Sequence, residues 1–436
     1  MTQPPPAPSA DRVTQLVRHL VTPDRDAAVL LTAHPGPHWT LELAAALWEL
    51  PLPEAQHRLK RLVQSELLIC HDDERHTMAT AVRAALERTG ATVLLPGCRH
   101  ARRRMVAHYT EHAIAADLVL DPGRWRWHPP MAEQVRLTMC DRFTSPAQAL
   151  RWFRNEQDNL LAVVELAHRT SHHQQVVLMA EAVNTWDERQ RPRGIRRLFE
   201  LGLASAEAVD DGGAQAVMHH AMASQHLRRG EHESALASAN YALALWSSED
   251  PRRSHPYHGR GLAHFHLLLS QAYEQVNDLL MAARYADLAV RISEAPGHPR
   301  DRALARYRQA LALSVDERWA EAAALLRSAL PPLIKGGERV WTALVHRTLC
   351  EVLMDLGQYE AAHQHGHTAL DLASQEEVPV VRGQVHESLA WLAHKQDDLD
   401  QARDHFEWAW ASYTPVDPQR AVRMLSSSRE FTRPTA

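Results

Sequence analysis

The sequence predicts an all-α fold: a solenoid of paired helices behind a small N-terminal domain that carries a short β-hairpin. Hydrophobic residues make up 45% of the 436 residues, with Ala and Leu dominant, and aromatic residues only 6%. Ala and Leu are good helix formers, so this composition favours helices over strands. The second observation is a set of alanines that recur about every 40 residues. The third is a helix–turn–helix pattern followed by a hairpin near the N-terminus.

Regularly spaced alanines mark an internal repeat in the second half of the chain. The first small residue of each copy is Ala235, Ala282, Ala322, Ala362 or Ala402, at steps of 47, 40, 40 and 40 residues. A second alanine follows seven residues later in every copy. Residues seven apart share one helical face, so two helices with Ala at both positions can pack closely. Each copy therefore predicts a pair of antiparallel helices, which must stack on its neighbours to bury its apolar face.

The residue five positions before the first alanine is predicted to lie in the loop between the paired helices. It is Gly230 or Gly357 in two copies, where glycine allows a left-handed helix cap. The loop glycine, an aromatic residue two positions later (Tyr359) and the two alanines resemble the tetratricopeptide repeat. The period of 40 exceeds the usual ~34 residues, and three copies lack the loop glycine. The longer period resembles the repeats of bacterial regulatory ATPases.

One more degenerate helix pair, at Ile195 and Gly202, extends the predicted repeats upstream. The sequence thus predicts about five to six tetratricopeptide-like repeats over residues 174–413, followed by a frayed C-terminal tail over 414–436. Residues 91–173 are predicted to be linker helices.

Residues 24–90 are predicted to form a winged-helix-like domain, preceded by a Pro-rich segment and a short helix over 1–23. Thr40 is a candidate N-cap for a helix over 41–50, and a further helix is expected over 54–65. A hairpin is expected to pair 67–70 with 75–78, and a last helix to run from 79 to about 88.

Three stretches carry a more specific resemblance. They are LLTAHPGPHWTLELAAALWELPLPEAQHRLKRLVQSELL (30–68), AHYTEHAIAADLVLDPGRW (107–125) and SPAQALRWFRNEQDNLLAVVELA (145–167). They are similar to the winged helix and linker helices of actinobacterial STAND ATPases, the NB-ARC and antibiotic-regulator type of signal-transduction ATPase. The resemblance implies a regulator in which this half follows an ATPase domain.

The nucleotide site of that family is not expected in this chain. No GxxxxGK[ST] loop is present to hold phosphates, and only about thirty residues precede the stretch 30–68 that resembles the winged helix. The resemblance places a Met-His-Asp element where this chain has Met78-Ala79-Thr80. We therefore expect a derivative without an ATPase, which binds no nucleotide and needs no cofactor.

The candidate functional site is the inner face of the repeats, where the first helix of each pair lines a concave groove in this architecture. Counting back from each loop position selects His220, Gln271, Glu274, Tyr307, Arg347, Glu351, Glu387 and Trp391. A mixture of charged and aromatic side chains suits a protein or peptide partner. The leading hypothesis is a non-catalytic scaffold or regulator. The alternative for the aromatic members is that they belong to the core.

The rival hypothesis is a transcriptional regulator that binds DNA through the winged helix. The helix over 54–65 carries Gln56, His57, Lys60 and Arg61, which could reach phosphates and base edges in a major groove. On the protein-binding hypothesis the same four residues are a solvated face.

Composition and motifs exclude other classes. The net charge of −5 indicates neither a nucleic-acid-coating nor a membrane-binding surface, and no apolar run approaches the ~18 residues of a membrane span. The four cysteines form no CxxC pair, which is typical of a reduced cytoplasmic protein. His363 and His367 share a helical face but lack a third ligand, and an HExxH-like string fails at Ala390. We therefore expect no metal site and no enzyme.

Overall fold

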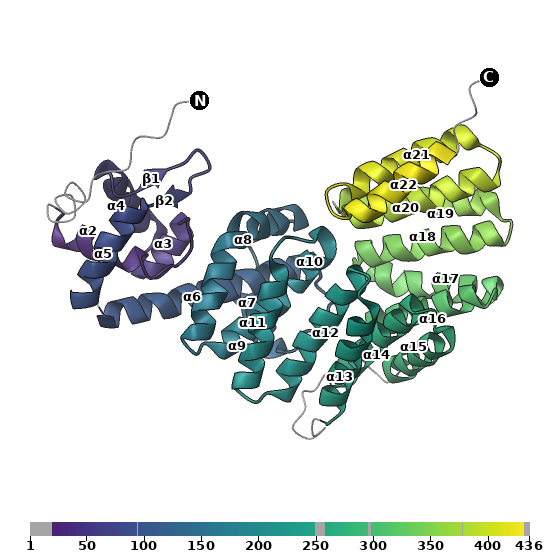
Figure 1. Ribbon diagram of the computed structural model, residues 1–436, viewed down its shortest axis with the longest axis horizontal. Coiled ribbons are helices and arrows are strands. Elements are labelled where there is room, and N and C mark those ends of the chain that lie inside the picture. The colour runs from purple at the N-terminus through teal and green to yellow at the C-terminus, as the bar shows by residue number, and fades with distance from the viewer. Residues whose placement is uncertain (1–19, 94, 249–257, 295–297, 377, 431–436) are drawn as a thin grey trace.

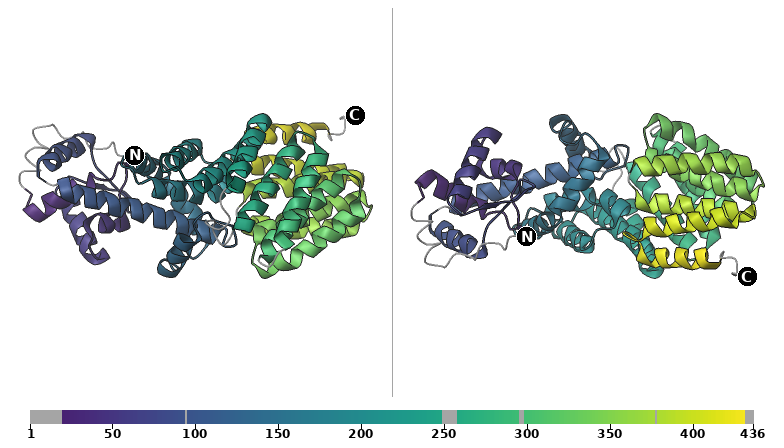
Figure 2. Two further views of the ribbon diagram at one scale, coloured as in Figure 1. Left: turned by 90° about the horizontal axis from the view of Figure 1, so that it is seen from below. Right: turned by 90° about the horizontal axis from the view of Figure 1, so that it is seen from above.

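The computed structural model describes residues 20–93, 95–248, 258–294, 298–376 and 378–430 (Figure 1). The N-terminal domain lies at one end of the long axis and the repeats lie at the other (Figures 1 and 2). The expected Pro-rich segment falls largely outside the described residues.

The N-terminal domain contains helices and a two-stranded antiparallel hairpin. Its elements are α2 (Thr22–Leu31), α3 (Leu41–Trp48), α4 (Leu52–Gln64), β1 (Ile69–Cys70), β2 (His76–Thr77) and α5 (Thr80–Val93). The Thr40 hydroxyl accepts a hydrogen bond from the Leu43 amide, as an N-cap should. Trp39 adds an isolated bridge to His76 beside the hairpin. The strands are shorter than expected and the last helix is longer, while the winged-helix assignment stays a prediction.

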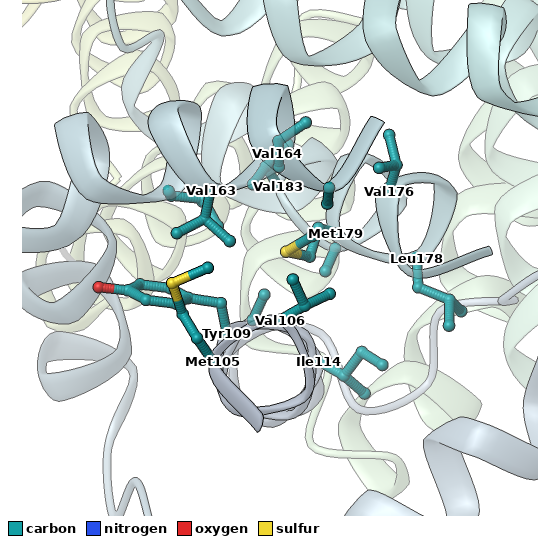
Figure 3. Close-up of a cluster of buried hydrophobic side chains, with 14 of the residues drawn as sticks. Met105, Val106, Tyr109, Ile114, Val163, Val164, Val176, Leu178, Met179 and Val183 are labelled. Carbon is teal, nitrogen blue, oxygen red and sulfur yellow. The ribbon is translucent and has the colours of Figure 1, made fainter. Parts of the chain in front are cut away.

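The linker helices join the N-terminal domain to the repeats through a continuous core. They are α6 (Leu95–Leu120), α7 (Pro129–Thr138) and α8 (Pro146–Arg169). Met105, Val106 and Tyr109 of α6 face Val163 of α8 and Met179 of α9 (His173–Ala182), and all five are buried (Figure 3). This apolar contact fixes the linker against the start of the solenoid.

The solenoid begins with α9 and α11 (Ile195–Ala208), which pack together with the short α10 (Asn184–Gln190) between them. A Cβ at Gly202 of α11 would overlap the side chains of Met218 and Ala180. Because glycine has no side chain, α11 can approach α9 and α12 closely at this position.

Five helix pairs follow, and they confirm the predicted repeat. They are α12 (Gly212–Arg228) with α13 (His232–Ser248), α14 (His258–Gln275) with α15 (Leu279–Glu294), α16 (Pro299–Val315) with α17 (Trp319–Lys335), α18 (Arg339–Asp355) with α19 (Tyr359–Gln375), and α20 (Pro379–Lys395) with α21 (Leu399–Tyr413). Both alanines of every copy are buried. The first helices of successive pairs contact one another and form the inner layer.

The loop residue of every pair has a left-handed backbone. Gly230 and Gly357 have φ of 72° and 74°, and Asn277, Glu317 and Asp397 have φ of 60°, 59° and 63°. The three copies without glycine thus keep the same turn, at the steric cost that a side chain adds in this region.

The expectation of a frayed C-terminal tail was wrong. Residues Pro418–Glu430 form α22, which packs on α21. Ala421 and Met424 of α22 are buried with Phe406 and Tyr413. The helix covers the apolar face that the last repeat would otherwise expose.

The ends of the solenoid meet. Helix α10, which lies near the start of the solenoid, contacts α20. Arg191, which follows α10, forms an ion pair at 2.7 Å with Asp417, which immediately precedes α22. Within α10, Arg189 lies 3.6 Å from Glu376. The repeats therefore curve back onto the segment that precedes them (Figure 1).

Candidate partner-binding groove

A cavity of about 140 Å³ lies between the inner helices and the segment 121–128 that joins α6 to α7. We call this segment the linker loop. Trp125 of the linker loop, His220, Leu268, Leu304, Arg308 and Trp341 are among the lining residues, and the last five come from α12, α14, α16 and α18. A second cavity of about 410 Å³ shares Asp121, Glu188 and Trp341 with the first. The groove therefore contains cavities bounded partly by the chain's own linker.

Asp117, at the end of α6, holds the linker loop in shape. It is 1% exposed, and it accepts hydrogen bonds from Arg124, Arg126 and Thr185 at 2.7, 2.7 and 2.6 Å. Burial acts to raise the pKa of this carboxyl, but the two guanidinium groups outweigh it and the pKa is lowered. Asp117 is therefore ionised, and it neutralises two arginines that would be costly to bury alone.

The linker loop is also tied to the repeats. Arg260 donates to the carbonyl oxygen of Gly123 at 3.0 Å, and Arg300 donates to Asp121 at 2.7 and 2.8 Å. A Cβ at Gly123 would overlap the side chains of Arg300 and Glu338. Only glycine lets the loop approach α16 this closely.

The aromatic rings of the linker loop add packing to these ion pairs. The Trp125 ring meets those of Trp246 and Phe265 edge-on, with centroids 5.2 and 6.0 Å apart. Trp125 is buried, so the loop contributes to the core as well as to the cavity wall.

Two predicted groove residues, His220 and Gln271, line the first cavity. Burial, followed by the neighbouring His264, lowers the pKa of His220 to about 3, so its imidazole is neutral near pH 7. Glu274 lies close by and pairs with Arg308 at 3.5 Å, while Gln271 accepts from the same guanidinium at 2.9 Å.

Three further predicted residues are brought into polar contacts on α18 and α20. Arg347 pairs with Glu351 at 2.7 Å, and Glu351 also accepts from the Ser388 hydroxyl at 2.6 Å. Glu387 accepts from Arg420 at 2.7 Å and from Tyr413 at 3.1 Å. These side chains have partners within the chain and serve packing between repeats.

The expectation for Tyr307 was wrong. Its side chain is 4% exposed and packs toward Trp341, with ring centroids 6.3 Å apart. Helix α16 turns this position toward α18, so the aromatic ring belongs to the core. Trp391, by contrast, is 41% exposed, with its ring near those of His394 and Phe406.

The four candidate DNA-binding residues all lie on the exposed side of α4. Arg61 is held by a bidentate ion pair with Asp24, with N–O distances of 2.7 and 2.9 Å. The His57 ring lies 2.7 Å from the Pro53 carbonyl oxygen. Gln56 and Lys60 extend from the same surface.

The described part of the chain brings two histidines of α19 together without forming a metal site. His363 and His367 stack with ring centroids 6.3 Å apart, but no group of three or more His, Cys, Asp or Glu side chains there could hold a metal ion. No helix among the described residues is long and apolar enough to cross a bilayer.

Sequence reasoning missed the contributions of the linker loop and of α10 to the groove. The residues Asp121, Trp125 and Glu188 have no counterpart in the 40-residue repeat, so the periodic count could not select them. The available signal was local: the stretch DPGRWRW packs two tryptophans and two arginines into a turn, which is unusual for a simple connection.

Comparison with known proteins finds structural similarity without a family assignment. No family model matches the chain, and no curated protein matches it in sequence. One similar structure is a STAND protein with a tetratricopeptide-repeat sensor from Pyrococcus horikoshii, at 12% identity and a TM-score of 0.48, over 98% of this chain and 65% of that one.

Two further structures are also similar to this chain. Aspartyl phosphate phosphatase F from Bacillus subtilis shares 11% identity, with a TM-score of 0.44, over 100% of this chain and 97% of that one. A Rap protein in complex with competence and sporulation factor shares 10% identity, with a TM-score of 0.45, over 75% and 99%. Because identities and scores are low, the fold is assigned from the chain's own helix pairs: it is a tetratricopeptide-like α-solenoid.

Proposed function

We propose that the protein is a non-catalytic scaffold or regulator that binds a segment of a protein or peptide in the groove between its inner helices and the linker loop. The observation that carries the proposal is the pair of adjoining cavities there, with apolar and polar side chains supplied by four successive inner helices and by the linker. A partner segment would gain affinity by burying apolar side chains against Leu268, Leu304 and Trp341.

The test compares the partners captured by the full chain with those captured by a variant whose first cavity is filled by a larger side chain. Ser224 lines the first cavity and is buried, so Ser224→Leu places additional volume inside it. Ser234 is exposed on the outer helix α13, and Ser234→Leu is the matched control. We expect cross-linking and mass spectrometry to find partners that the control retains and Ser224→Leu loses. Equal capture by both variants, with both folded by circular dichroism, would refute the proposed site.

The finer origin of the protein is also a proposal. We infer a relative of the STAND regulators in which the residues of this chain bind no nucleotide and the N-terminal domain is a winged helix that serves as a structural cap. Calorimetric titration with ADP, with and without magnesium, tests this inference, and micromolar binding would overturn it.

The DNA-binding alternative has its own test. The exposed Gln56, His57 and Lys60 are available on α4, but Arg61 is already paired with Asp24. A salt-dependent mobility shift that Lys60→Ala abolishes would establish it. The absence of any shift at low salt would exclude it.

A further inference from the structure

Glu188 of α10 lines both cavities of the groove. Its side chain is exposed to this space, although protein surrounds it. It accepts a hydrogen bond from the Asn184 amide nitrogen at 3.0 Å, and it forms no ion pair within 4 Å among the described residues. Burial raises the pKa of this carboxyl, against the effect of more distant arginines. Glu188 is thus a carboxyl without a cation in direct contact.

The neighbouring charges have partners of their own. Arg124 pairs with Asp117 at 2.7 Å, Asp121 pairs with Arg300 at 2.7 Å, and Arg228 pairs with Asp187. Each of these guanidinium groups thus has a carboxylate partner of its own, although Arg124 Nε and Arg300 Nη1 make no hydrogen bond with the described residues. None of the three arginines is in direct contact with Glu188, so a cation bound there would be its first close ion-pair partner.

Further polar atoms around the cavity have no hydrogen-bond partner among the described residues. The Asn184 side-chain oxygen is one of them, on a residue that is 6% exposed and lines the first cavity. This amide oxygen accepts hydrogen bonds and cannot donate them, and the same is true of an ionised carboxylate. The indole N–H of Trp125, 5% exposed, is another, and it suits a carbonyl oxygen. Buried polar atoms normally have partners, so both atoms are available for a hydrogen bond to a bound ligand.

The rest of the lining suits the body of such a ligand. Trp341 belongs to both cavities, and an aromatic face attracts a cation. Leu267 and Leu304 line the first cavity and can contact a hydrocarbon stem. Its 140 Å³ is close to the roughly 150 Å³ of a cavity that admits benzene, so one side chain fits.

We propose that the groove recognises a basic side chain of its peptide partner, with the ammonium or guanidinium group bound by Glu188 and the Asn184 side-chain oxygen against Trp341. The Trp125 indole donates to the peptide backbone. This inference rests on the proposed function and narrows it to one class of ligand.

The test uses hexylammonium as the probe, with hexan-1-ol and hexanoate as matched neutral and anionic probes. In calorimetric titrations at pH 8, the full chain is expected to bind hexylammonium about tenfold more tightly than hexan-1-ol, since one charge-assisted hydrogen bond contributes that much. Glu188→Gln is nearly isosteric and should abolish this preference, and Glu188→Asp should restore part of it. Glu233→Gln, on the exposed surface of α13, is the control and should leave it unchanged.

Two results would overturn the inference: hexylammonium binding no better than hexan-1-ol or hexanoate, or a preference unaffected by Glu188→Gln. If partner capture still responds to Ser224→Leu in that case, the proposed function stands and only the ligand class is wrong. A second comparison uses two capped pentapeptides that are identical except for Lys in one and norleucine in the other. Their relative affinities show whether the groove binds a basic side chain within a peptide or only a free amine. A preference for the Lys peptide supports the proposal, and binding of the free amine alone contradicts it.

Discussion

The repeat array from α12 to α21 and the segment from α6 to α10 build the same groove by different means. In the array, identical small residues recur at fixed spacing, and the helices associate through close apolar packing. In the α6–α10 segment, the chain is held by individual ion pairs around Asp117 and Asp121, and its residues occur once. Repetition therefore builds the scaffold, while unique residues shape the cavities within it.

The largest effect should come from the unique segment. Asp117→Ala would leave the buried Arg126 without its carboxylate and Arg124 with only the longer contact to Glu181 at 3.6 Å, which is expected to lower the free energy of unfolding by about 3–5 kcal/mol. Urea denaturation measures the change. Glu321→Gln, which removes the exposed Arg318–Glu321 pair, should change little. A loss at Asp117 no larger than the loss at Glu321 would show that the linker loop is not held as described.

The second test overfills a repeat interface. Ala409 is fully buried on α21, and Ala411 is exposed on the same helix. Ala409→Leu should lower stability by about 1–3 kcal/mol because the extra atoms have no space. Ala411→Leu makes the same change in helix propensity as Ala409→Leu and should be close to neutral in the same thermal or urea measurement. Similar effects of the two changes would contradict close packing at the alanine positions.

A third test concerns histidines that the repeat brings into contact. His386 and His405 pair across α20 and α21 with ring nitrogens 3.1 Å apart. Burial lowers the pKa of each histidine to about 4, with smaller contributions from His405 and Arg382 at His386, and from His367 and His363 at His405. The unfolded value is about 6.5.

The unfolded chain therefore binds more protons between pH 6.5 and 4, so stability should fall as the pH drops through this window and level off below it. The slope is at most about 1.4 kcal/mol per pH unit for each histidine. Replacing both with Gln should reduce the slope of the unfolding free energy measured from pH 7 to 4, while other buried histidines such as His220 maintain the rest of it. An unchanged slope would mean that neither histidine titrates as described.

The smallest effect is expected in the loops between paired helices. Glu317 has φ of 59°, where a side chain costs about 1 kcal/mol relative to glycine. Glu317→Gly should therefore raise the melting temperature slightly, and Gly357→Ala in the equivalent turn should lower it. If differential scanning calorimetry shows changes of opposite sign in the melting temperature, the two turns are equivalent. Changes of the same sign would refute this equivalence.

The same contrast explains what the sequence could predict. The repeat alanines and the loop turns follow from periodicity, since residues such as Ala322 and Ala362 do the same task at the same spacing. Tyr307 was misplaced because the count gave a helical face without the rotation of α16 toward α18. The frayed tail was misjudged because α22 is stabilised by Ala421 and Met424 packing on the last repeat, outside the periodic pattern. Glu188 and Trp125 are brought to the groove by tertiary folding, so no local sequence pattern predicts their position there.

The contact between the two ends of the solenoid has a consequence for how such a protein can evolve. An open array can gain or lose a repeat by duplication, since each unit contacts only its neighbours. Here Arg191 pairs with Asp417 across the array, and α10 contacts α20. Inserting a further unit of 40 residues would move α22 away from Arg191. The number of repeats is thus fixed by geometry, and variation is expected through substitution inside the groove instead of through changes in length.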